Sequence, residues 1–281
     1  MKSEQKPLVE LIAEQLKGGM LELPVFNSVA VKLQQTLSHH DFKLDEIIAM
    51  INEDQSLASK VLKVANSTYY AGLSTIATIK DAIVRLGAQE VANMVMVASQ
   101  QESFRSENEP LNNLLQQLWV HSFSCASGAQ WLAKKSGYIN LASECFMAGL
   151  LHDIGQLALL KVLDDIYRSG KTKIIFSDTL ICEVLDRMHQ EIGGELMRLW
   201  SLPQAYCDIA ANHHKTDFDN NDILAAIVRL SDKACKKIGK SLHPEPTLSL
   251  ISSPEALVLR LNEVTMAELE IFVEDVGEMG V

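Results

Sequence analysis

The chain has 281 residues, of which 47% are hydrophobic and 22% are charged, the ordinary balance of a soluble globular protein. This composition excludes disorder as the main state, and the length allows one large domain or two small ones with a substantial core. A formal net charge of −11 argues against a broad nucleic-acid surface, which needs a basic face to displace counterions.

The cysteines and the N-terminus indicate a cytoplasmic protein. Five cysteines lie far apart in the sequence and form no Cys-x-x-Cys pair, a pattern typical of reduced thiols. Residues 1–19 mix lysine and glutamate and lack the apolar core of a signal peptide. No apolar run approaches the roughly 20 residues that span a bilayer. We therefore expect no membrane segment.

Short helices are predicted in the first part of the chain. After Pro24, a residue suited to a first helical turn, apolar residues recur at helical spacing from Val25 to Leu37. The same pattern predicts helices over residues 44–51, 57–64, 79–86 and 89–99, with Gly87 closing one of them. Residues 107–110 form a polar break.

Longer helices are predicted in the rest of the chain, over residues 111–136, 141–162, 178–200, 203–214 and 222–238. An interruption at Gly193-Gly194 is an open alternative, and the acidic stretch 254–278 is predicted to form one or two small helices. No alternating strand pattern persists, so the fold class is all-α. We expect an N-terminal helix over 1–20, a domain over 21–239 with lobes 21–109 and 110–239, and an acidic C-terminal extension over 240–281.

Histidines and aspartates stand on the apolar faces of the longer helices. His121 shares a face with Leu118 and Cys125, and Asp232 follows Val228 at helical spacing. Residues 146–155 are apolar nearly all round, as in a buried helix, yet they contain a His-Asp pair. The full set, in chain order, is His121, His152, Asp153, His189, His213, His214 and Asp232.

Two buried carboxylates need partners, because each costs several kcal/mol when left alone, about as much as a domain's net stability. The sequence places almost no lysine or arginine on these faces, but it offers five imidazoles. A divalent metal held by imidazole and carboxylate resolves the cost, and this ligand mix suits Fe, Mn, Zn, Co or Ni. The alternative is that each histidine is an ordinary hydrogen-bonded core residue and each aspartate bonds a neighbouring backbone group.

The order of these residues resembles a known signature. His152-Asp153, with His121 before it and Asp232 after it, is similar to the core of the HD superfamily of metal-dependent phosphohydrolases, and the additional histidines match its HD-GYP and HDOD branches. Segments 23–26, 51–57, 61–67, 79–87 and 119–122 resemble HDOD signatures. The resemblance implies an HD-domain-like helical bundle with an N-terminal lobe of small helices.

The resemblance also implies roles for the residues. His121, His152, Asp153 and Asp232 would hold a first divalent metal, and Asp153 would bridge to a second that His189, His213 and His214 complete. In an enzyme of this superfamily His152 and Asp153 would be catalytic, acting on a nucleotide or another phosphoester. One or two transition metals are therefore expected.

Two departures bear on catalysis. HD-GYP enzymes carry a phosphate-binding lysine where this chain has Gln156, and the Gly-Tyr-Pro element after the paired histidines is absent. Both argue against hydrolysis of cyclic dinucleotides. Lys215 is a candidate phosphate contact, with a solvated loop lysine as the alternative.

Two functions follow from the resemblance. The first is a bacterial signal-transduction module that acts through a signalling protein partner. The second is a metal-dependent phosphohydrolase with a phosphoester ligand. DNA binding by the first helices is disfavoured, because clustered Arg and Lys are missing there and the net charge is negative. We expect neither nucleic acid nor a membrane as partner.

Overall fold

The computed structural model describes residues 12, 27–38, 42–67, 70, 75–169 and 177–279. These residues form helices and no strand, which confirms the all-α fold class. The helix predicted over residues 1–20 lies outside the described residues except for Ile12. The chain divides into two compact units, one of residues 24–103 with 200–203 and one of 1–23, 104–199 and 204–281.

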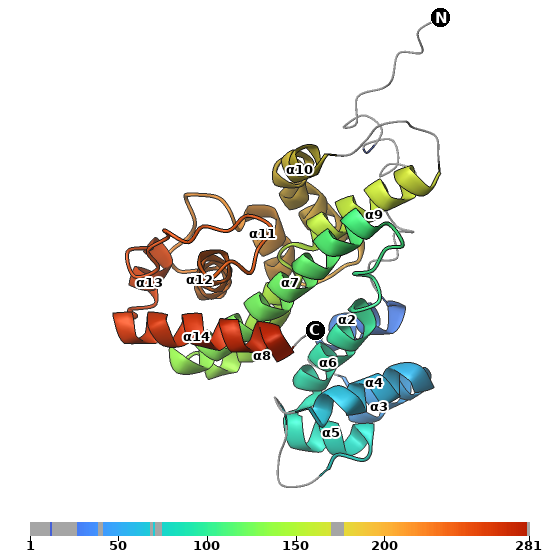
Figure 1. The fold of residues 1–281 in the computed structure, drawn as a ribbon. Helices are drawn as coiled ribbons and strands as arrows, with labels where there is room; N and C mark the ends of the chain where they lie inside the picture. Colours follow the sequence, from blue (N-terminus) through green and yellow to red (C-terminus); the bar gives the residue numbers. More distant parts are fainter. Residues whose placement is uncertain are drawn as a thin grey trace, which may run out of the picture. The chain divides into compact units, whose positions relative to one another are not determined.

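The unit of residues 24–103 contains short helices, drawn from blue to teal in Figure 1. Their bounds are α2 Ser28–Ser38, α3 Leu44–Asn52, α4 Gln55–Ala65, α5 Ile79–Leu86 and α6 Ala88–Gln100. The carboxylate of Asp54 caps α4 and the hydroxyl of Thr78 caps α5, each by accepting a backbone N–H. Gly87, with φ of 90°, separates α5 from α6 in a conformation that favours glycine. Helix α6 packs against α2, α4 and α5.

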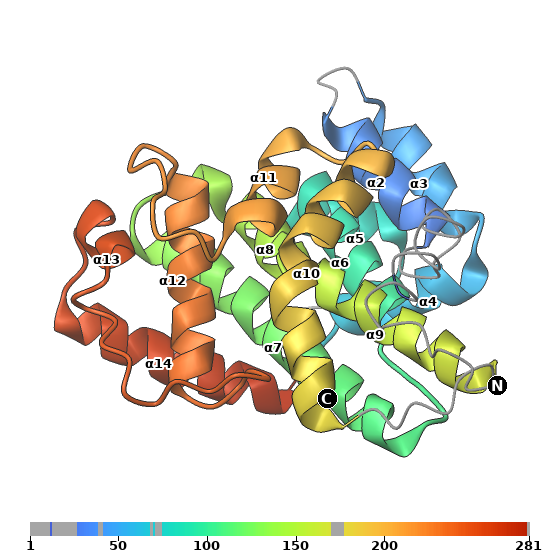
Figure 2. The same ribbon diagram turned by 90° about the horizontal axis from the view of Figure 1, so that it is seen from above.

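The other unit is built around α7, the longest helix described, with α8 and α14 packed along it (Figures 1 and 2). Asn108 caps its first turn and Pro110 stands within that turn. The helices are α7 Glu109–Lys135, α8 Ala142–Leu151, α9 Ile154–Arg168, α10 Asp178–Leu199, α11 Gln204–Asn212, α12 Ile223–Lys237, α13 Pro254–Val258 and α14 Glu263–Met279, with a short 3-10 turn η1 at Ile139–Leu141.

The single helix predicted over residues 141–162 is wrong. The chain forms α8 and α9 instead, and His152-Asp153 is the joint between them, where Asp153 has φ of −102° and ψ of 19°. The whole segment is apolar and buried, so its sequence shows no amphipathic face from which a change of direction could be predicted. The joint places the His-Asp pair between the two helices rather than along one of them.

The interruption considered at Gly193-Gly194 does not occur, because α10 continues to Leu199. These glycines serve close packing. A Cβ atom on Gly155 would collide with the carbonyl of His189 on α10, and one on Gly193 would lie 3.2 Å from the amide nitrogen of Gly155. Glycine at both positions therefore allows the backbones of α9 and α10 to approach each other, beside two of the histidines.

The acidic C-terminal stretch forms α13 and α14 and contributes to the core. Met266, Leu269, Val273 and Val276 on α14 are buried, and a Cβ on Gly128 of α7 would collide with Val273. Among the described residues one segment, Ile139–Arg168, is long and apolar enough to cross a membrane, but 94% of its apolar window is buried inside the protein. That burial is typical of core helices.

Candidate metal centre

The structure brings all seven predicted site residues together within one unit. His121 stands on α7, the His152-Asp153 pair joins α8 to α9, and the others come from α10, the end of α11 and α12. Six of the seven are buried, with exposed fractions between 1% and 4%, and only His214 is exposed. The donor atoms form two neighbouring groups, one of His121, His152 and Asp232 and one of Asp153, His189, His213 and His214.

The first group closes around two carboxylates. The Nε2 atom of His121 lies 3.2 Å from Oδ2 of Asp153 and 3.4 Å from Oδ1 of Asp232. The Nε2 atom of His152 lies 3.3 Å and 3.8 Å from the same two oxygens. Both imidazoles therefore point at a common centre that both aspartates share.

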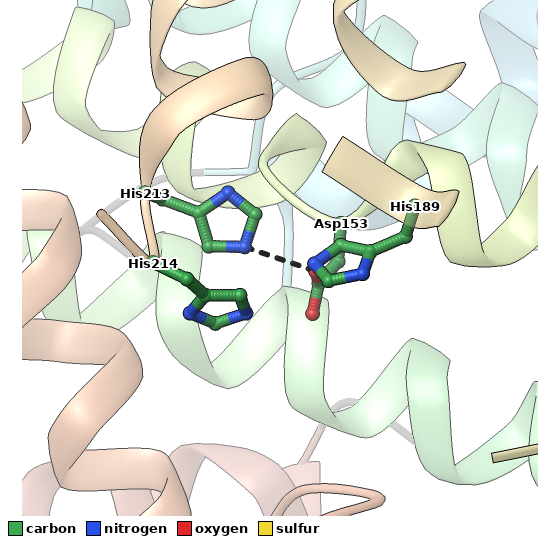
Figure 3. Close-up of side chains that lie close together, drawn as sticks. All are labelled: Asp153, His189, His213 and His214. Carbon is green, nitrogen blue, oxygen red and sulfur yellow. Dashed lines mark ion pairs between the residues drawn. The ribbon is translucent and has the colours of Figure 1, made fainter. Parts of the chain in front are cut away.

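The second group gathers on the other oxygen of Asp153, as Figure 3 shows. Oδ1 of Asp153 lies 3.3 Å from Nε2 of His213 and 3.6 Å from Nε2 of His189. The ring centroids of His214 and His213 lie 4.0 Å apart. Asp153 thus faces one group of histidines with each of its two oxygens.

Backbone carbonyls fix the orientation of four rings. The Nδ1 atom of His152 lies 2.7 Å from the Gly149 carbonyl oxygen, and that of His189 lies 2.7 Å from the Leu185 oxygen. The Nδ1 atom of His121 lies 2.7 Å from the Lys240 carbonyl oxygen. The Nδ1 atom of His213 lies 3.1 Å from the carbonyl oxygens of both Ile209 and Ala210. A carbonyl only accepts, so each Nδ1 carries the proton and donates it. In the neutral ring the Nε2 lone pair then faces the centre.

This arrangement leaves lone pairs without protons. Nε2 of His121 lies 3.2 Å from Nε2 of His152, and two neutral rings held by Nδ1–H cannot satisfy each other there. Within the described part of the chain, hydrogen-bond partners are also missing for Oδ1 of Asp153, Oδ1 of Asp232, Nε2 of His189 and Nε2 of His213. A metal at about 2.1 Å from its ligands places neighbouring donors about 3.0 to 3.5 Å apart, close to these spacings. The donor set fits a divalent ion.

Electrostatics keep the two carboxyl groups ionised. In the metal-free protein burial favours their neutral forms, but the charge of a protonated His152 and hydrogen bonds from protonated neighbouring rings hold the pKa of Asp153 well below its ordinary value. For Asp232 burial is outweighed chiefly by Lys236, so its pKa is also lowered. Burial lowers the pKa of His213, which keeps that ring neutral. Ionised carboxylates and neutral imidazoles are the forms that bind metals.

Sequence reasoning missed Lys236. Its Nζ atom donates to Oδ2 of Asp232 at 2.7 Å, and it lies 3.4 Å from Nδ1 of His214. The expectation that almost no cation faces these helices' interior is therefore wrong for α12. The i to i+4 spacing of Asp232 and Lys236 was the available signal.

A second missed feature supports the loop that carries His213. Arg229 is buried, donates from Nε to Oε1 of Glu255 at 2.8 Å, and donates from Nη1 to the carbonyl of His213 at 2.6 Å. Glu255 is fully buried and also accepts from Lys233 at 2.5 Å. Glu255 therefore ties α13 to the loop that carries His213 through Arg229.

Lys215 and Gln156 are the two positions that bear on phosphate binding. Lys215 is exposed and lines a pocket of about 270 Å³ beside His213. Four aspartates line the same pocket, Asp208, Asp217, Asp219 and Asp222. Carboxylates repel a phosphate, so this lining disfavours Lys215 as the phosphate contact. Gln156 is 7% exposed, and its Oε1 atom has no hydrogen-bond partner among the residues that the structure describes.

Comparison with known proteins places the chain in a family. The model of the HDOD domain matches residues 23–216, more than half of the chain. The chain belongs to the HDOD family. Asp232, Lys236 and Lys240 of this HDOD protein lie beyond the matched residues, although all three contact the site.

Solved structures share the fold. An HDOD domain protein of unknown function from Geobacter sulfurreducens is 23% identical and superposes with a TM-score of 0.77 over 97% of this chain and 96% of its own. A protein of Shewanella amazonensis SB2B named "putative metal-dependent phosphohydrolase" is 18% identical, with a TM-score of 0.69 over 96% and 98%. At these identities the likeness shows the fold alone.

Two further relatives are longer than this chain. A "putative signal transduction protein" of Marinobacter aquaeolei VT8 is 20% identical, with a TM-score of 0.72 over 97% of this chain and 64% of its own. An uncharacterized protein of Treponema pallidum (strain Nichols) is 25% identical over 210 residues, which are 72% of this chain and 40% of that protein. The chain therefore spans less than two thirds of either relative.

Proposed function

We propose that this HDOD protein holds one or two divalent transition metals and acts as a regulatory module in bacterial signal transduction. The metal ligands would be His121, His152, Asp153, His189, His213, His214 and Asp232, and Asp153 would serve both positions. We further propose an HDOD domain over residues 21–239 with lobes 21–109 and 110–239, followed by the extension 240–281. The ligand mix suits Fe, Mn, Zn, Co or Ni.

One observation carries the metal assignment. The Nε2 atoms of His121 and His152 face each other at 3.2 Å, and the Nδ1 protons of both rings are already donated to backbone carbonyls. Two lone pairs this close repel unless a cation lies between them or one ring binds a proton. The unpartnered oxygens Oδ1 of Asp153 and Oδ1 of Asp232 add negative charge to the same place, which favours a divalent cation over a single proton.

The regulatory assignment is supported by closure of the site. Six of the seven donors are buried, the position of the phosphate-binding lysine of HD-GYP enzymes holds the buried Gln156, and Lys215 lines an acidic pocket. A metal held by buried donors contributes its binding free energy to the stability of the fold. The name of the Marinobacter relative agrees with a signalling context. We propose a signalling protein as partner and the cytoplasm as location.

The test combines metal content with turnover. Purified full-length protein is analysed for metals by mass spectrometry, and the metal-loaded protein is incubated with a panel of nucleotide and other phosphoesters. Tightly bound transition metal without turnover is the expected result. A metal-free protein that gains no stability from any of the five candidate ions would sink the proposal.

A metal-dependent phosphohydrolase is the second candidate, and it is favoured by the completeness of the donor set. A bound divalent ion would supply Lewis acidity and lower the pKa of water in the site. His152 and Asp153 would then be catalytic, with Asp153 held ionised by the surrounding rings. Turnover that disappears in both His152→Ala and Asp153→Ala, with the helical circular dichroism retained, would favour this candidate over the regulatory one.

A further inference from the structure

The metal centre has one open side. The donors His121, His152, Asp153, His189, His213 and Asp232 are buried, whereas His214 is exposed. Beside His214 stands Lys236, whose side chain is 14% exposed and whose Nζ lies 3.4 Å from Nδ1 of that ring. An anion that reaches the centre from solvent through this side passes His214 and Lys236.

Lys236 carries donor capacity beyond its present contacts. An ammonium group has three N–H donors. One goes to Oδ2 of Asp232 at 2.7 Å, and the contact with His214 at 3.4 Å is at most a long hydrogen bond. At least one donor is therefore left for a ligand. Asp232 meanwhile directs its other oxygen, Oδ1, toward His121 and His152, so Lys236 lies beside the proposed metal position and not in it.

The neighbouring cations are engaged elsewhere. On the same helix, Lys233 donates to Glu255 and Lys237 donates to Glu270 at 2.6 Å. Arg229 is bound by Glu255 and by the carbonyl of His213. Of the lysines on α12, Lys236 is the one whose ammonium contacts the donor cluster.

We propose that Lys236 is the anion-binding residue of the metal centre, where its ammonium donates to a phosphate oxygen of a phosphoester at the open side. The role that HD-GYP enzymes give to the lysine at the position of Gln156 would come here from a different helix. This inference rests on the proposed metal site. It names the residue that would bind the phosphoester of the second candidate function, and it requires binding rather than turnover.

Replacing Lys236 should change the affinities for phosphate and for metal in opposite directions. Lys236 attracts phosphate but repels a divalent cation and occupies one oxygen of Asp232. In Lys236→Gln the affinity for phosphate should fall about tenfold or more, the range of a lost charge-assisted hydrogen bond. The affinity for metal should rise by roughly threefold to tenfold, because a nearby positive charge is gone. A residue that merely supports the fold would weaken both.

The experiment uses inorganic phosphate as the probe. Full-length wild type, Lys236→Gln, Lys215→Gln and the control Lys237→Gln are loaded with metal, their metal content is measured, and phosphate binding is followed by calorimetry. We expect weaker phosphate binding in Lys236→Gln alone, with metal retained. Metal-loaded Lys236→Gln that binds phosphate as well as wild type overturns the inference, as does weakening in Lys215→Gln instead.

Other outcomes separate this inference from the proposed function. A wild-type protein that holds metal but binds no phosphate overturns the anion-binding role and leaves the metal centre intact. Loss of metal in Lys236→Gln also overturns it, since Lys236 would then only hold Asp232 in place. A wild-type protein that holds no metal removes the proposed function itself, together with the inference that rests on it.

Discussion

The two halves of the ligand cluster use the same residue types in different surroundings. Protein encloses the half formed by His121, His152 and Asp232, whose exposed fractions are 1% to 3%. The Nδ1–H group of His121 also donates a hydrogen bond to the backbone carbonyl of Lys240. The half that contains His189 and His213 ends at the exposed His214. Water can replace a lost ligand only in the second half. The enclosed half should therefore bind metal more tightly, and the open half should exchange it.

The largest effect is expected from the residue common to both halves. Asp153→Asn keeps the shape of the side chain but removes the charge that His121, His152 and His213 face. Metal affinity should fall by more than about a hundredfold, beyond the range of changes outside the ligand shell. Titration with a metal-sensitive dye measures it. The matched control is Asp165→Asn, an exposed aspartate on α9; equal affinities in the two variants would remove Asp153 from the ligand set.

The difference between the halves is tested directly by His152→Ala and His214→Ala. The first removes a buried proposed ligand whose place water cannot easily fill, so metal affinity should fall by about a hundredfold. The second removes an exposed proposed ligand, and water should limit the loss to about tenfold. Both are followed by metal content after dialysis against a chelator. If His214→Ala loses as much metal as His152→Ala, the proposed difference between the halves is wrong.

The sequence was sufficient to find the side chains that converge, because a histidine or aspartate on the apolar stripe of a helix must face the interior. His121 and Asp232 were found in this way, and both are buried. The sequence was not sufficient to predict where one helix ends and the next begins when the whole segment is apolar. The joint at His152-Asp153 contains neither proline nor a polar break, so it resembled continuous helix.

Supporting groups were missed for other reasons. The carbonyl of Lys240, which orients His121, is a backbone group that every residue has, so the sequence does not indicate this contact. Glu255 belongs to an acidic stretch whose carboxylates are usually solvated, yet it is fully buried between Arg229 and Lys233. Only the tertiary fold brings these groups to the site, so local pattern could not predict them.

Glu255→Gln tests whether the open half depends on this support. The substitution keeps the shape but leaves the buried Arg229 without its charge partner, so Arg229 should hold the carbonyl of His213 less firmly. We expect the metal affinity of the open half to fall by about tenfold and the free energy of unfolding to fall by about 2 to 3 kcal/mol. Glu270→Gln, which releases only the half-buried Lys237, is the control. A fall in the metal affinity of the enclosed half alone would contradict the proposal that Glu255 supports the open half.

The smallest expected effect is the dependence of stability and metal affinity on pH. Burial lowers the pKa of His152, but the charges of Asp153 and Cys125 and the hydrogen bonds to them together outweigh burial, and the metal-free protein holds this pKa well above the ordinary value of 6.5. A protonated His152 then stabilises the metal-free fold below pH 6.5, and this contribution is lost as the pH rises through the raised pKa. The lowered pKa of Asp153 contributes stability above its ordinary value of 3.8, which is lost as the pH falls further.

Metal binding at His152 would therefore displace the proton of that ring. At neutral pH we expect about one proton to be released per ion bound in the enclosed half, and metal affinity to rise with pH. Calorimetry in buffers of different ionisation enthalpy measures the proton count. The open half should release fewer, because burial lowers the pKa of His213 and that ring is already neutral. Equal proton release at both positions would show that the two halves do not differ in protonation before the metal arrives.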